Sequence, residues 1–570
     1  MIAQGFSRRA LIGGAAALMG GSVLSGGAAV AARPAVDPAD YPSLGLEALG
    51  HLNHFHRLAR QAPGDWNDMG IQAPTQDGDD ALHWQLPFMA YGLAVAQYVR
   101  TPAYRELHRG SIGRLIEKMR RTEVWNYWEE ASTGEDVFHH DRALVRKADP
   151  DPLRHGNVEY SGNALAMMAL YELLYRDGKW SRPNAFALRR VQGGDLQEFD
   201  YDLPKLTQVA LRQFVANGYL GMECEPDGVY PTTCNTFPLQ AFMAYDAVYG
   251  TRYAAEVVPR HIAAWRKIST LYRTDSGGQA AMGFYISRDA LLVSDANTWG
   301  KGQFLNVYAA DYMRTMYPRW RERLFDIDSD GMLVVKPAPP PSTVQLGPPP
   351  HAHHMTQAAR PAPREFFSFA EQLAHKVGPV AAEFGDPDLQ RAAMKFVNFH
   401  NPPIWRDGEL YYERNDEFGT PRFLTRRANI VIGSGHVWAR NAFHDLYNKP
   451  WTAETLQTPE LREVDYPKVL VQQAYYDRAR DALVVTLLPH GVLPDSRQPR
   501  DVDTQVLIAN LAPGATYAVT RDGEPIAQVA AGRVTTVGAS EAATVSPEGL
   551  RLRARLRGAP QTYVIAGVRA

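Results

Sequence analysis

The apolar residues of the chain recur mainly at helical spacing from about residue 40 to about residue 450. Clear examples are the runs 84–91, 164–171 and 239–245, in which apolar side chains occupy most positions around the helix. A helix that is apolar around most of its circumference must be covered on more than one side. The pattern therefore predicts a mainly α fold over residues 40–455, in which paired helices form a toroid with a ligand pocket at one mouth.

The pattern changes from about residue 460 to alternating, β-branched runs. These runs are separated by turn residues, and examples lie at 482–488, 504–508 and 562–566. Such short alternating segments are typical of a small all-β sandwich, which we expect over residues 460–570. This region is poor in candidate catalytic residues, so we expect it to have a structural or surface-binding role.

A proline-rich segment interrupts the helical pattern at about residues 335–363. It contains two runs of three consecutive prolines, 339–341 and 348–350. Proline removes a backbone donor and fixes φ, which favours extended polyproline structure. We therefore expect an exposed insertion with polyproline character within the helical domain.

The N-terminus carries the consecutive arginines Arg8 and Arg9, followed by a glycine- and alanine-rich apolar run to about Ala32. Residues 29–31 form a plausible cleavage box. This arrangement predicts a twin-arginine signal peptide over residues 1–32, and hence a periplasmic or secreted protein. The apolar run is too short and too rich in glycine for a membrane anchor, and no later segment is expected to span a membrane.

The charge balance narrows the class of partner. Lysine and arginine number 60 and aspartate and glutamate number 62, so the charges nearly cancel. The composition therefore gives no electrostatic reason to expect binding to nucleic acid or to an anionic membrane. The hydrophobic content of 45% is ample for a large core. We expect a small-molecule substrate as the partner.

The two cysteines, Cys224 and Cys234, lie ten positions apart. In an oxidising compartment this spacing favours a disulfide that closes a short loop. The alternative is a pair of reactive thiols beside Glu225 and Asp227, where a carboxylate can pass a proton while the sulfur protonates or attacks a substrate. The spacing leaves both interpretations open, and oxidation could switch such a site off.

The cysteines belong to one of several collinear motifs. Cys-Glu-Pro-Asp at 224–227 precedes Cys-Asn at 234–235, and the other motifs lie at 88–94, 124–130, 157–162 and 245–251. In this order the motifs resemble the linalool dehydratase/isomerase family over about residues 80–250, and more weakly over about 45–450. The proline-rich segment and the C-terminal β region lie outside the resemblance.

The resemblance implies an (α/α)6 barrel that assembles with further copies into a ring. It also implies removal or migration of a hydroxyl group on a terpenoid alcohol, with no metal and no organic cofactor. Cys224, Glu225 and Cys234 would line the pocket as catalytic residues, with Cys234 the stronger candidate for direct proton transfer. Trp84 would form part of an aromatic wall in contact with the substrate.

Three positions depart from the family pattern. Asn163 stands where the family has a catalytic histidine, His56 where it has an aspartate, and Glu159 where it has a methionine in the pocket. We expect Glu159 and His56 to replace the lost proton-transfer groups, and the substrate to be more polar than linalool. The structural alternatives are a first-turn acid for Glu159, a hydrogen-bonded surface or interface histidine for His56, and a helix cap or hydroxyl-orienting group for Asn163.

Further candidates for substrate contact follow from the same motifs. Trp128 belongs to an aromatic and acidic stretch, although a buried tryptophan with solvent-facing acids explains that stretch as well. The remaining candidates come from the cysteine segment, from the stretch after Asn157 and from the far side of the predicted barrel, and they are Tyr160, Asn163, Asp227, Tyr230, Asn235 and His400.

The leading hypothesis is a cofactor-independent lyase or isomerase that acts on a hydroxylated terpenoid-like or other apolar alcohol by Cys/Glu acid–base catalysis. One rival is an exported polysaccharide lyase or glycoside hydrolase, because a helical toroid with a trailing β-sandwich and paired acids also suits those enzymes. A second rival is a non-catalytic relative that only binds a ligand.

Overall fold

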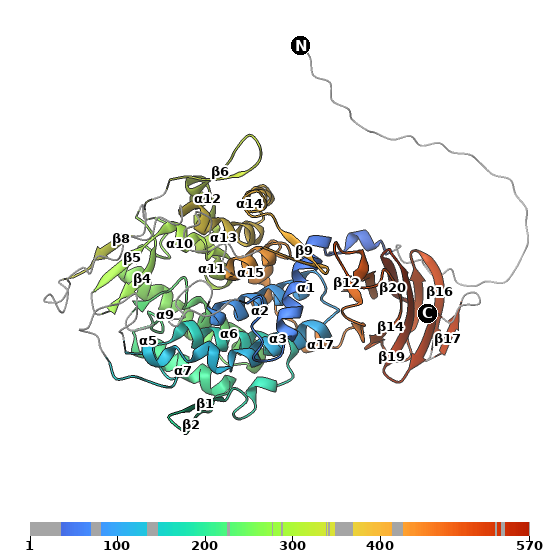
Figure 1. Cartoon of the computed structure of the whole chain (residues 1–570), viewed down its shortest axis with the longest axis horizontal. Coiled ribbons are helices and arrows are strands. Elements are labelled where there is room, and N and C mark those ends of the chain that lie inside the picture. The colour runs from blue at the N-terminus through green and yellow to red at the C-terminus, as the bar shows by residue number, and fades with distance from the viewer. Residues whose placement is uncertain are drawn as a thin grey trace, which may run out of the picture.

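The structure of the 570-residue chain is a computed structural model (Figure 1). It describes residues 36–69, 81–133, 146–224, 228–275, 278–286, 289–337, 339, 342–347, 369–412, 426–530, 533–536 and 542–568. The predicted signal peptide and the candidates Glu225 and Asp227 lie outside the described residues.

Helices make up most of the N-terminal part, as the hydrophobic spacing predicts. The three runs quoted above fall within α2, α6 and α8, which are buried along most of their length. The longer helices are α1 (Leu46–Arg60), α2 (Leu82–Val99), α3 (Glu106–Met119), α6 (Val158–Tyr175), α7 (Leu203–Ala216), α8 (Thr236–Tyr249), α9 (Tyr253–Ile268), α12 (Ala310–Leu324), α13 (Phe369–Phe384), α14 (Pro387–His400) and α15 (Arg426–Gly435). Shorter ones are α4 (Thr122–Trp125), α5 (Trp128–Ala131), α10 (Asp295–Trp299), α11 (Gly302–Tyr308), α16 (Ala442–Asn448) and α17 (Ala453–Leu456).

Small antiparallel sheets also lie within this helical part, and the helical spacing did not predict them. Strand β3 pairs with β4, β4 with β5 and β5 with β8, and three two-stranded hairpins complete the set. The strands are β1 (Leu188–Gln192), β2 (Asp195–Phe199), β3 (Gly228–Val229), β4 (Ala281–Tyr285), β5 (Ala290–Val293), β6 (Phe325–Ile327), β7 (Leu333–Val335), β8 (Ser342–Gln345), β9 (Ile404–Arg406) and β10 (Glu409–Tyr411). The fold is therefore mixed, with helices predominant in its N-terminal part.

Part of the proline-rich insertion forms regular structure that the sequence pattern did not predict. Its residues 342–345 form strand β8, which pairs antiparallel with β5 through partners such as Leu291 and Val344. All four residues are exposed, so this strand is an edge of the sheet. None of the four is a proline, and each can therefore pair through its backbone N–H, so these four residues form a strand and not a polyproline stretch.

The C-terminal region consists of two antiparallel sheets, as the alternating pattern predicts. One sheet has the strand order β11-β14-β19-β18 and the other β12-β13-β20-β15-β16-β17. Apolar side chains of both sheets form one shared core cluster, which includes Val506, Leu552, Val485 and Ile565. The strands are β11 (Glu460–Arg462), β12 (Val469–Asp477), β13 (Ala482–Pro489), β14 (Asp501–Ala509), β15 (Thr516–Arg521), β16 (Glu524–Ala530), β17 (Arg533–Thr536), β18 (Ala543–Ser546), β19 (Gly549–Arg557) and β20 (Gln561–Val568).

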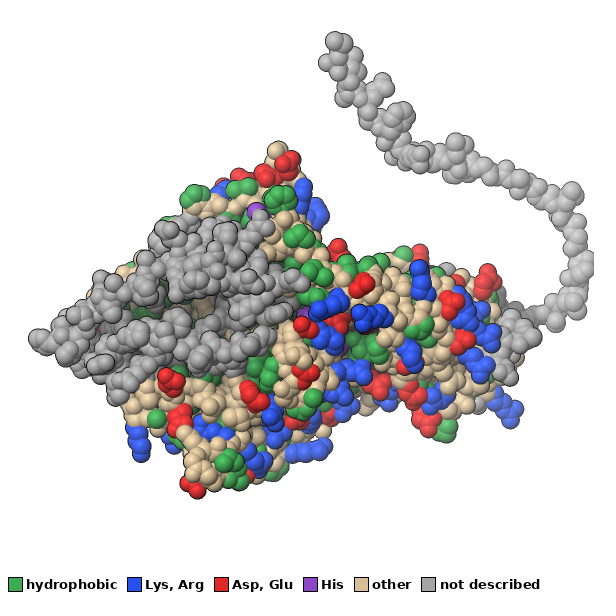
Figure 2. All heavy atoms as spheres, in the orientation of Figure 1, with side chains coloured by type: hydrophobic (Ala, Val, Ile, Leu, Met, Phe, Trp, Pro, Cys, Tyr) green, Lys and Arg blue, Asp and Glu red, His purple; other side chains and the backbone are tan. Residues whose placement is uncertain are grey.

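Backbone hydrogen bonds join the two parts. Ala103, between α2 and α3, donates to Ala474 at 3.0 Å and accepts from Leu461 at 2.7 Å, and Leu44 donates to Gln472 at 2.9 Å. The sheets thus pack beside α1 and α3 (Figure 1). Over the C-terminal sheets in Figure 2, cationic and anionic side chains intermingle, in agreement with the near-zero net charge.

Within the part of the chain that the structure describes, no helix is both long enough and apolar enough to cross a bilayer.

Candidate active site

The two cysteines are held by a short loop structure in front of α8. Cys224 makes isolated β-bridges with Asn157 and Gly228, and its backbone N–H donates to the Gly228 carbonyl at 2.7 Å. Cys234 lies just before α8, and Asn235 is the residue that begins that helix. Because Asn157 also begins α6, one bridge fixes the Cys224 strand against the start of the helix that carries Glu159.

The Asn235 side chain forms hydrogen bonds to the backbone on either side of Cys224. Its Oδ1 accepts from the backbone N–H of Met222 at 2.7 Å, and its Nδ2 donates to the Met222 carbonyl at 3.0 Å and to the Tyr230 carbonyl at 3.2 Å. Gly221 has φ +137°, and a Cβ at that position would lie 2.5 Å from the Asn235 side chain. The predicted substrate contact Asn235 is therefore fully engaged in holding the loop.

The first turn of α6 brings Glu159 to the cysteines. The Asn157 side chain caps this helix by accepting from the backbone N–H of Tyr160 at 3.3 Å. The backbone N–H of Val158 donates to the Glu223 carbonyl at 3.0 Å, which ties the turn to the residue before Cys224. Glu159 is consequently aimed inward, and its side chain is only 16% exposed.

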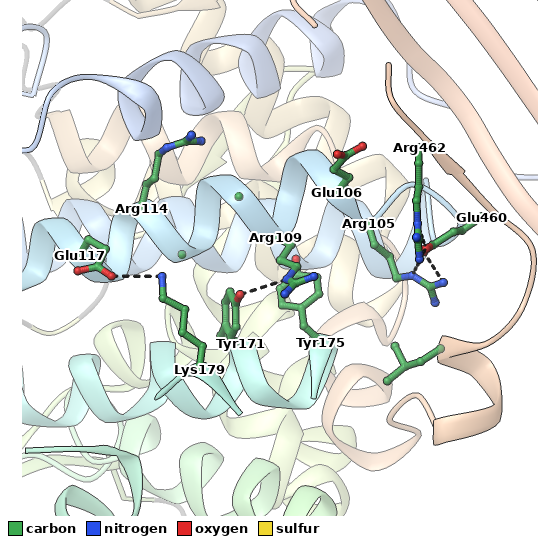
Figure 3. Close-up of a pocket in the computed structure, with 13 residues that line it drawn as sticks. Arg105, Glu106, Arg109, Arg114, Glu117, Tyr171, Tyr175, Lys179, Glu460 and Arg462 are labelled. Carbon is green, nitrogen blue, oxygen red and sulfur yellow. Dashed lines mark hydrogen bonds and ion pairs between the residues drawn. The ribbon is translucent and has the colours of Figure 1, made fainter. Parts of the chain in front are cut away.

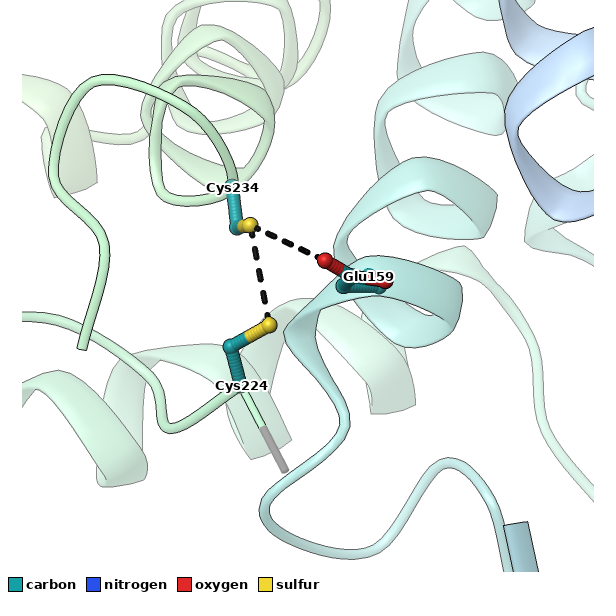
Figure 4. A group of neighbouring side chains, drawn as sticks. All are labelled: Glu159, Cys224 and Cys234. Carbon is teal, nitrogen blue, oxygen red and sulfur yellow. Dashed lines mark hydrogen bonds between the residues drawn. The ribbon is translucent and has the colours of Figure 1, made fainter. Parts of the chain in front are cut away.

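Glu159, Cys224 and Cys234 form one compact cluster (Figure 4). The Cys234 Sγ lies 3.5 Å from the Glu159 Oε1 and 3.7 Å from the Cys224 Sγ. A disulfide needs an S–S distance of about 2.05 Å. Both cysteines are buried free thiols, so the disulfide that spacing alone favours is not formed.

The protonation states within the cluster differ. Burial acts to raise the pKa of Glu159, but hydrogen bonds from His83 and from the two cysteines outweigh it and lower that pKa below its usual range. Burial raises the pKa of the Cys234 thiol, and the neighbouring Glu159 charge raises it further, against opposing effects of Cys224 and Lys301. Near neutral pH the cluster therefore holds a carboxylate beside a protonated thiol.

His83 on α2 contacts the Glu159 carboxylate, a role that no sequence pattern indicated. Its Nε2 lies 3.4 Å from the Glu159 Oε2, and its ring stacks on Tyr127 with centroids 5.1 Å apart. The only sequence signal was its position directly before Trp84 in an apolar helix.

Aromatic side chains of α2, α8 and α11 pack together, and those of α2 and α8 closely follow His83 and Cys234 in the chain; we call this group the aromatic wall. The Trp84 ring packs against Phe88 and Phe237 at centroid distances of 6.1 and 5.8 Å, and Phe237 packs against Phe304 at 5.5 Å. Trp84 is almost fully buried. Trp84 therefore packs within a group of buried aromatic side chains, and its contact with a substrate stays a prediction.

Lys301 is a second residue that sequence patterns did not reveal. Its Nζ lies over the rings of Trp84 and Phe88, 5.6 and 5.7 Å from their centroids. Burial, and then repulsion by Lys376, lower the pKa of Lys301 to about 7, while Cys234 and Glu159 act in the opposite direction. A buried lysine with so low a pKa beside a thiol and a carboxylate is a feature of functional sites.

Two of the predicted contacts point into the protein interior instead. The Asn163 Nδ2 donates to the Glu159 carbonyl at 2.6 Å, and its Oδ1 accepts from the Tyr91 hydroxyl at 3.5 Å. The Tyr160 hydroxyl donates to the Met119 carbonyl at 2.7 Å, toward the end of α3. Asn163 steadies the turn that presents Glu159, and the Tyr160 hydroxyl is engaged away from the cysteines.

His56 has partners on other elements. Its Nδ1 lies 2.8 Å from the Ser111 Oγ, and its ring packs against His108 and Tyr466 at centroid distances of 5.1 and 5.6 Å. Burial, followed by repulsion from His108 and Arg60, lowers the pKa of His56 well below its usual range. His56 of α1 is therefore buried and neutral, and its ring lies against α3 and the segment that leads to the C-terminal sheets.

The remaining predicted contacts are Trp128, His400 and Tyr230, and they lie on different elements. Trp128 is buried beside Gly156, close to the start of α6, and His400 packs its ring on Phe396 and Phe399 at the end of α14. The Tyr230 hydroxyl donates to the Tyr285 hydroxyl at 3.3 Å, and the Tyr230 carbonyl accepts from the backbone N–H of Cys234 at 3.3 Å.

The cluster also has the composition of a metal site. One ligand atom from each of Glu159, Cys224 and Cys234 lies within 4.8 Å of the others. Two sulfurs and a carboxylate oxygen suit a zinc-like ion.

A separate cavity of about 610 Å³ lies between α3, the end of α6 and strand β11 (Figure 3). Several of its charged groups are paired, as in Lys179–Glu117 at 3.2 Å and Arg109 with the Tyr171 hydroxyl at 3.3 Å. Its lining residues are Arg105, Glu106, Arg109, Gly110, Gly113, Arg114, Glu117, Tyr171, Tyr175, Lys179, Leu456, Glu460 and Arg462. None of the cluster residues lines it.

Comparison with known families connects these features. A family model described as "Linalool dehydratase/isomerase" matches residues 83–418, which is more than half of the chain. The matched region runs from His83 through the cluster and Lys301 to strand β10, and ends before the C-terminal sheets. With a match of this extent, which includes all three cluster residues, the chain belongs to the linalool dehydratase/isomerase family.

Proposed function

We propose that this protein is a hydro-lyase or isomerase that eliminates water from, or shifts the hydroxyl group of, a hydroxylated terpenoid-like or other apolar alcohol. The observation that carries the proposal is the contact between the protonated Cys234 thiol and the Glu159 carboxylate, 3.5 Å apart beside an aromatic wall. Family membership supports a reaction of the dehydratase/isomerase kind.

The Cys234 thiol is the proposed acid. It donates its proton to the substrate hydroxyl, and the C–O bond breaks with release of water. The thiolate that remains is stabilised by the Cys224 thiol at 3.7 Å and by the positive charge of Lys301. Cys224 and Lys301 stabilise the thiolate more than the neutral thiol, so they lower the barrier to proton donation.

The Glu159 carboxylate is the proposed base. After the hydroxyl leaves, the substrate carries a cation-like allylic or tertiary centre, which the faces of Trp84 and its aromatic neighbours stabilise. Glu159 removes a proton from the adjacent carbon, and the electron pair of that C–H bond forms the alkene. Transfer of this proton from Glu159 to the Cys234 thiolate, along their hydrogen bond, restores both groups.

We also propose the finer features that the resemblance implies. The helices around α2, α6 and α8 would belong to an (α/α)6 barrel, copies of the chain would assemble into a ring, and the chain would be exported through the twin-arginine pathway. The packing of α6 against α2 and α8 supports paired helices, and the Arg8–Arg9 pair supports export. The proposed chemistry uses only side chains of the protein.

The test is a screen of the full-length, reduced protein with a broad panel of tertiary and allylic alcohols. Mass spectrometry should detect a product lighter by about 18 Da, the mass of one water, or a rearranged alcohol of equal mass. Cys234→Ser and Glu159→Gln should each lower kcat by about 10²- to 10⁴-fold.

Glu129→Gln and Glu130→Gln are the matched controls. Glu129 is held by two residues of strand β1, Arg190 at 2.7 Å and Gln192 at 3.0 Å. Both controls should keep full activity. If oligosaccharides were cleaved instead, with loss on changing Glu129 or Glu130 and tolerance of Cys234→Ser, the protein would be a carbohydrate enzyme and the proposal would be wrong.

A further inference from the structure

Two lysines and a histidine lie together next to the cysteine cluster. Lys301 lies in the turn between α10 and α11, and His375 and Lys376 are neighbours on α13. A Cβ placed on Gly300 would lie 3.0 Å from the Lys376 side chain, and one on Gly302 would lie 3.2 Å from Val380. Helix α13 thus packs directly on this turn, and the two glycines leave room for the lysines to approach each other.

These cationic groups form no direct ion pair within the described part of the chain. Lys301 is 6% exposed and His375 7% exposed. No carboxylate or other acceptor among the described residues pairs with Lys301 or Lys376, and the His375 Nε2 is buried without a hydrogen-bond partner there. The Lys301 ammonium lies instead over the faces of Trp84 and Phe88.

The pKa values of the three side chains are those expected of buried cationic groups that lack an ion pair. Burial lowers the pKa of Lys376 to about 8, as burial and Lys376 lower the pKa of Lys301 to about 7. Burial, and then the two lysine charges, lower the pKa of His375 well below its usual range. Near neutral pH the group therefore carries between one and two positive charges, which a bound anion would stabilise.

The lysine group is also connected to the proposed chemistry. Trp84, which lies under Lys301, follows His83 on α2, and His83 contacts Glu159. Cys234 and Glu159 lie close enough to raise the pKa of Lys301, and the positive charge of Lys301 in turn lowers the pKa of Cys234.

We propose that Lys301, Lys376 and His375 form an oxyanion pocket that binds a carboxylate of the substrate, so that the substrate is a hydroxy acid whose hydroxyl group faces Cys234. This inference rests on the proposed function, because it places the substrate in the same site. A single negative charge matches the net charge of the group, and the aromatic wall receives the apolar remainder of the molecule.

Calorimetric binding to full-length, reduced protein tests the pocket with three probes of equal chain length: octanoate, 1-octanol and octyl phosphate. Octanoate should bind most tightly. Lys301→Met and Lys376→Met should each weaken octanoate binding by at least about tenfold, because a charged hydrogen bond is lost, and should leave octanol binding within about twofold. Lys267→Met, on the exposed face of α9, is the matched control and should change neither.

The pH dependence provides a test that needs no variant. The titratable and charged groups that face Lys301 are His375 and Lys376 on α13, Glu159 on α6 and Cys234 before α8. Octanoate stays ionised between about pH 6 and 9, whereas the lysines lose their protons around their pKa values of about 7 and about 8. Octanoate binding should therefore weaken across this range, and octanol binding should not.

Equal binding of octanoate and octanol, or octanoate binding that Lys301→Met and pH leave unchanged, would overturn the pocket. Tighter, lysine-dependent binding of octyl phosphate would overturn the carboxylate assignment. If Lys301→Met fails to fold by circular dichroism, Lys301→Arg keeps the charge and should retain octanoate binding without the decline above pH 7. Since these measurements need no turnover, they are independent of whether the alcohol screen succeeds.

Discussion

At the scale of single residues, the site depends on groups whose protonation is set by their surroundings. Glu159 stays ionised because His83 and the thiols donate to it, and Cys234 stays protonated because it is buried beside a carboxylate. An unassisted glutamate at this depth would take up a proton. The surroundings of each group therefore determine which acts as the acid and which as the base of the proposed reaction.

The pH dependence of kcat/KM follows from these directions. With a neutral alcohol as substrate, activity should fall on the acid side only below the usual pKa range of glutamate, since the base must be ionised. On the alkaline side it should decline first around the Lys301 pKa of about 7, as the charge that stabilises the thiolate is lost, and again above the usual range of a thiol, since the acid must be protonated. His83→Phe keeps a ring stacked on Tyr127 but removes the donor, so the acid limb should move to higher pH.

Steady-state rates between about pH 4 and 10 check this prediction, with His400→Phe as the control for loss of a histidine. An acid limb that stays in place in His83→Phe would show that His83 does not hold the Glu159 charge.

At the scale of secondary-structure elements, the cluster exists because the starts of two helices meet at one loop. Asn157 begins α6 and bridges to Cys224, and Asn235 begins α8 and binds the backbone on both sides of the cysteine loop. The helices α6 and α8 themselves pack closely against each other. Both asparagines position the site without contributing a reacting atom.

Asn235→Ala should loosen this loop. It removes both side-chain partners of the buried Met222 backbone, whereas the Tyr230 carbonyl keeps the backbone N–H groups of Cys234 and Asn235, and the loss should lower the free energy of unfolding by about 2–4 kcal/mol. The thiols should also react faster with a thiol reagent. Urea denaturation and the rate of thiol labelling measure the two effects, and Asn448→Ala, at the exposed end of α16, is the comparison. Unchanged labelling would contradict a positioning role.

At the scale of the whole molecule, the C-terminal sheets are joined to the helices by a buried ion pair as well as by backbone hydrogen bonds. Arg105 on the helical side donates to Glu460 of β11 and, at 3.2 Å, to the Thr455 carbonyl. Glu460 is only 4% exposed. A buried carboxylate that loses a partner is costly, even though Arg462 remains beside it.

Arg105→Met should therefore destabilise the protein by about 2–4 kcal/mol and separate the unfolding of the sheets from that of the helices. Differential scanning calorimetry should show a lower or a split transition. Arg478→Met removes an exposed pair with Glu454, at 3.2 Å, and should shift the transition little. Equal effects of the two substitutions would indicate that the buried pair does not couple the two parts.

The sequence by itself determined the features that depend on local periodicity and on collinear motifs. The 3.6-residue spacing of 164–171 and 239–245 placed helices α6 and α8, and alternation placed the C-terminal strands, because each pattern records which side of an element is buried. The ordered motifs around Cys224 and Cys234 indicated the family, which the match over residues 83–418 shows.

Only the tertiary structure decided which of the candidates meet. Glu159 lies 75 positions from Cys234 in the chain, and no local pattern specifies that contact or the free state of the thiols. Nothing near Lys301 in the sequence marks it, since its low pKa comes from burial and from Lys376 on another helix. Packing between distant helices sets these distances, and with them the charges on which the proposed chemistry depends.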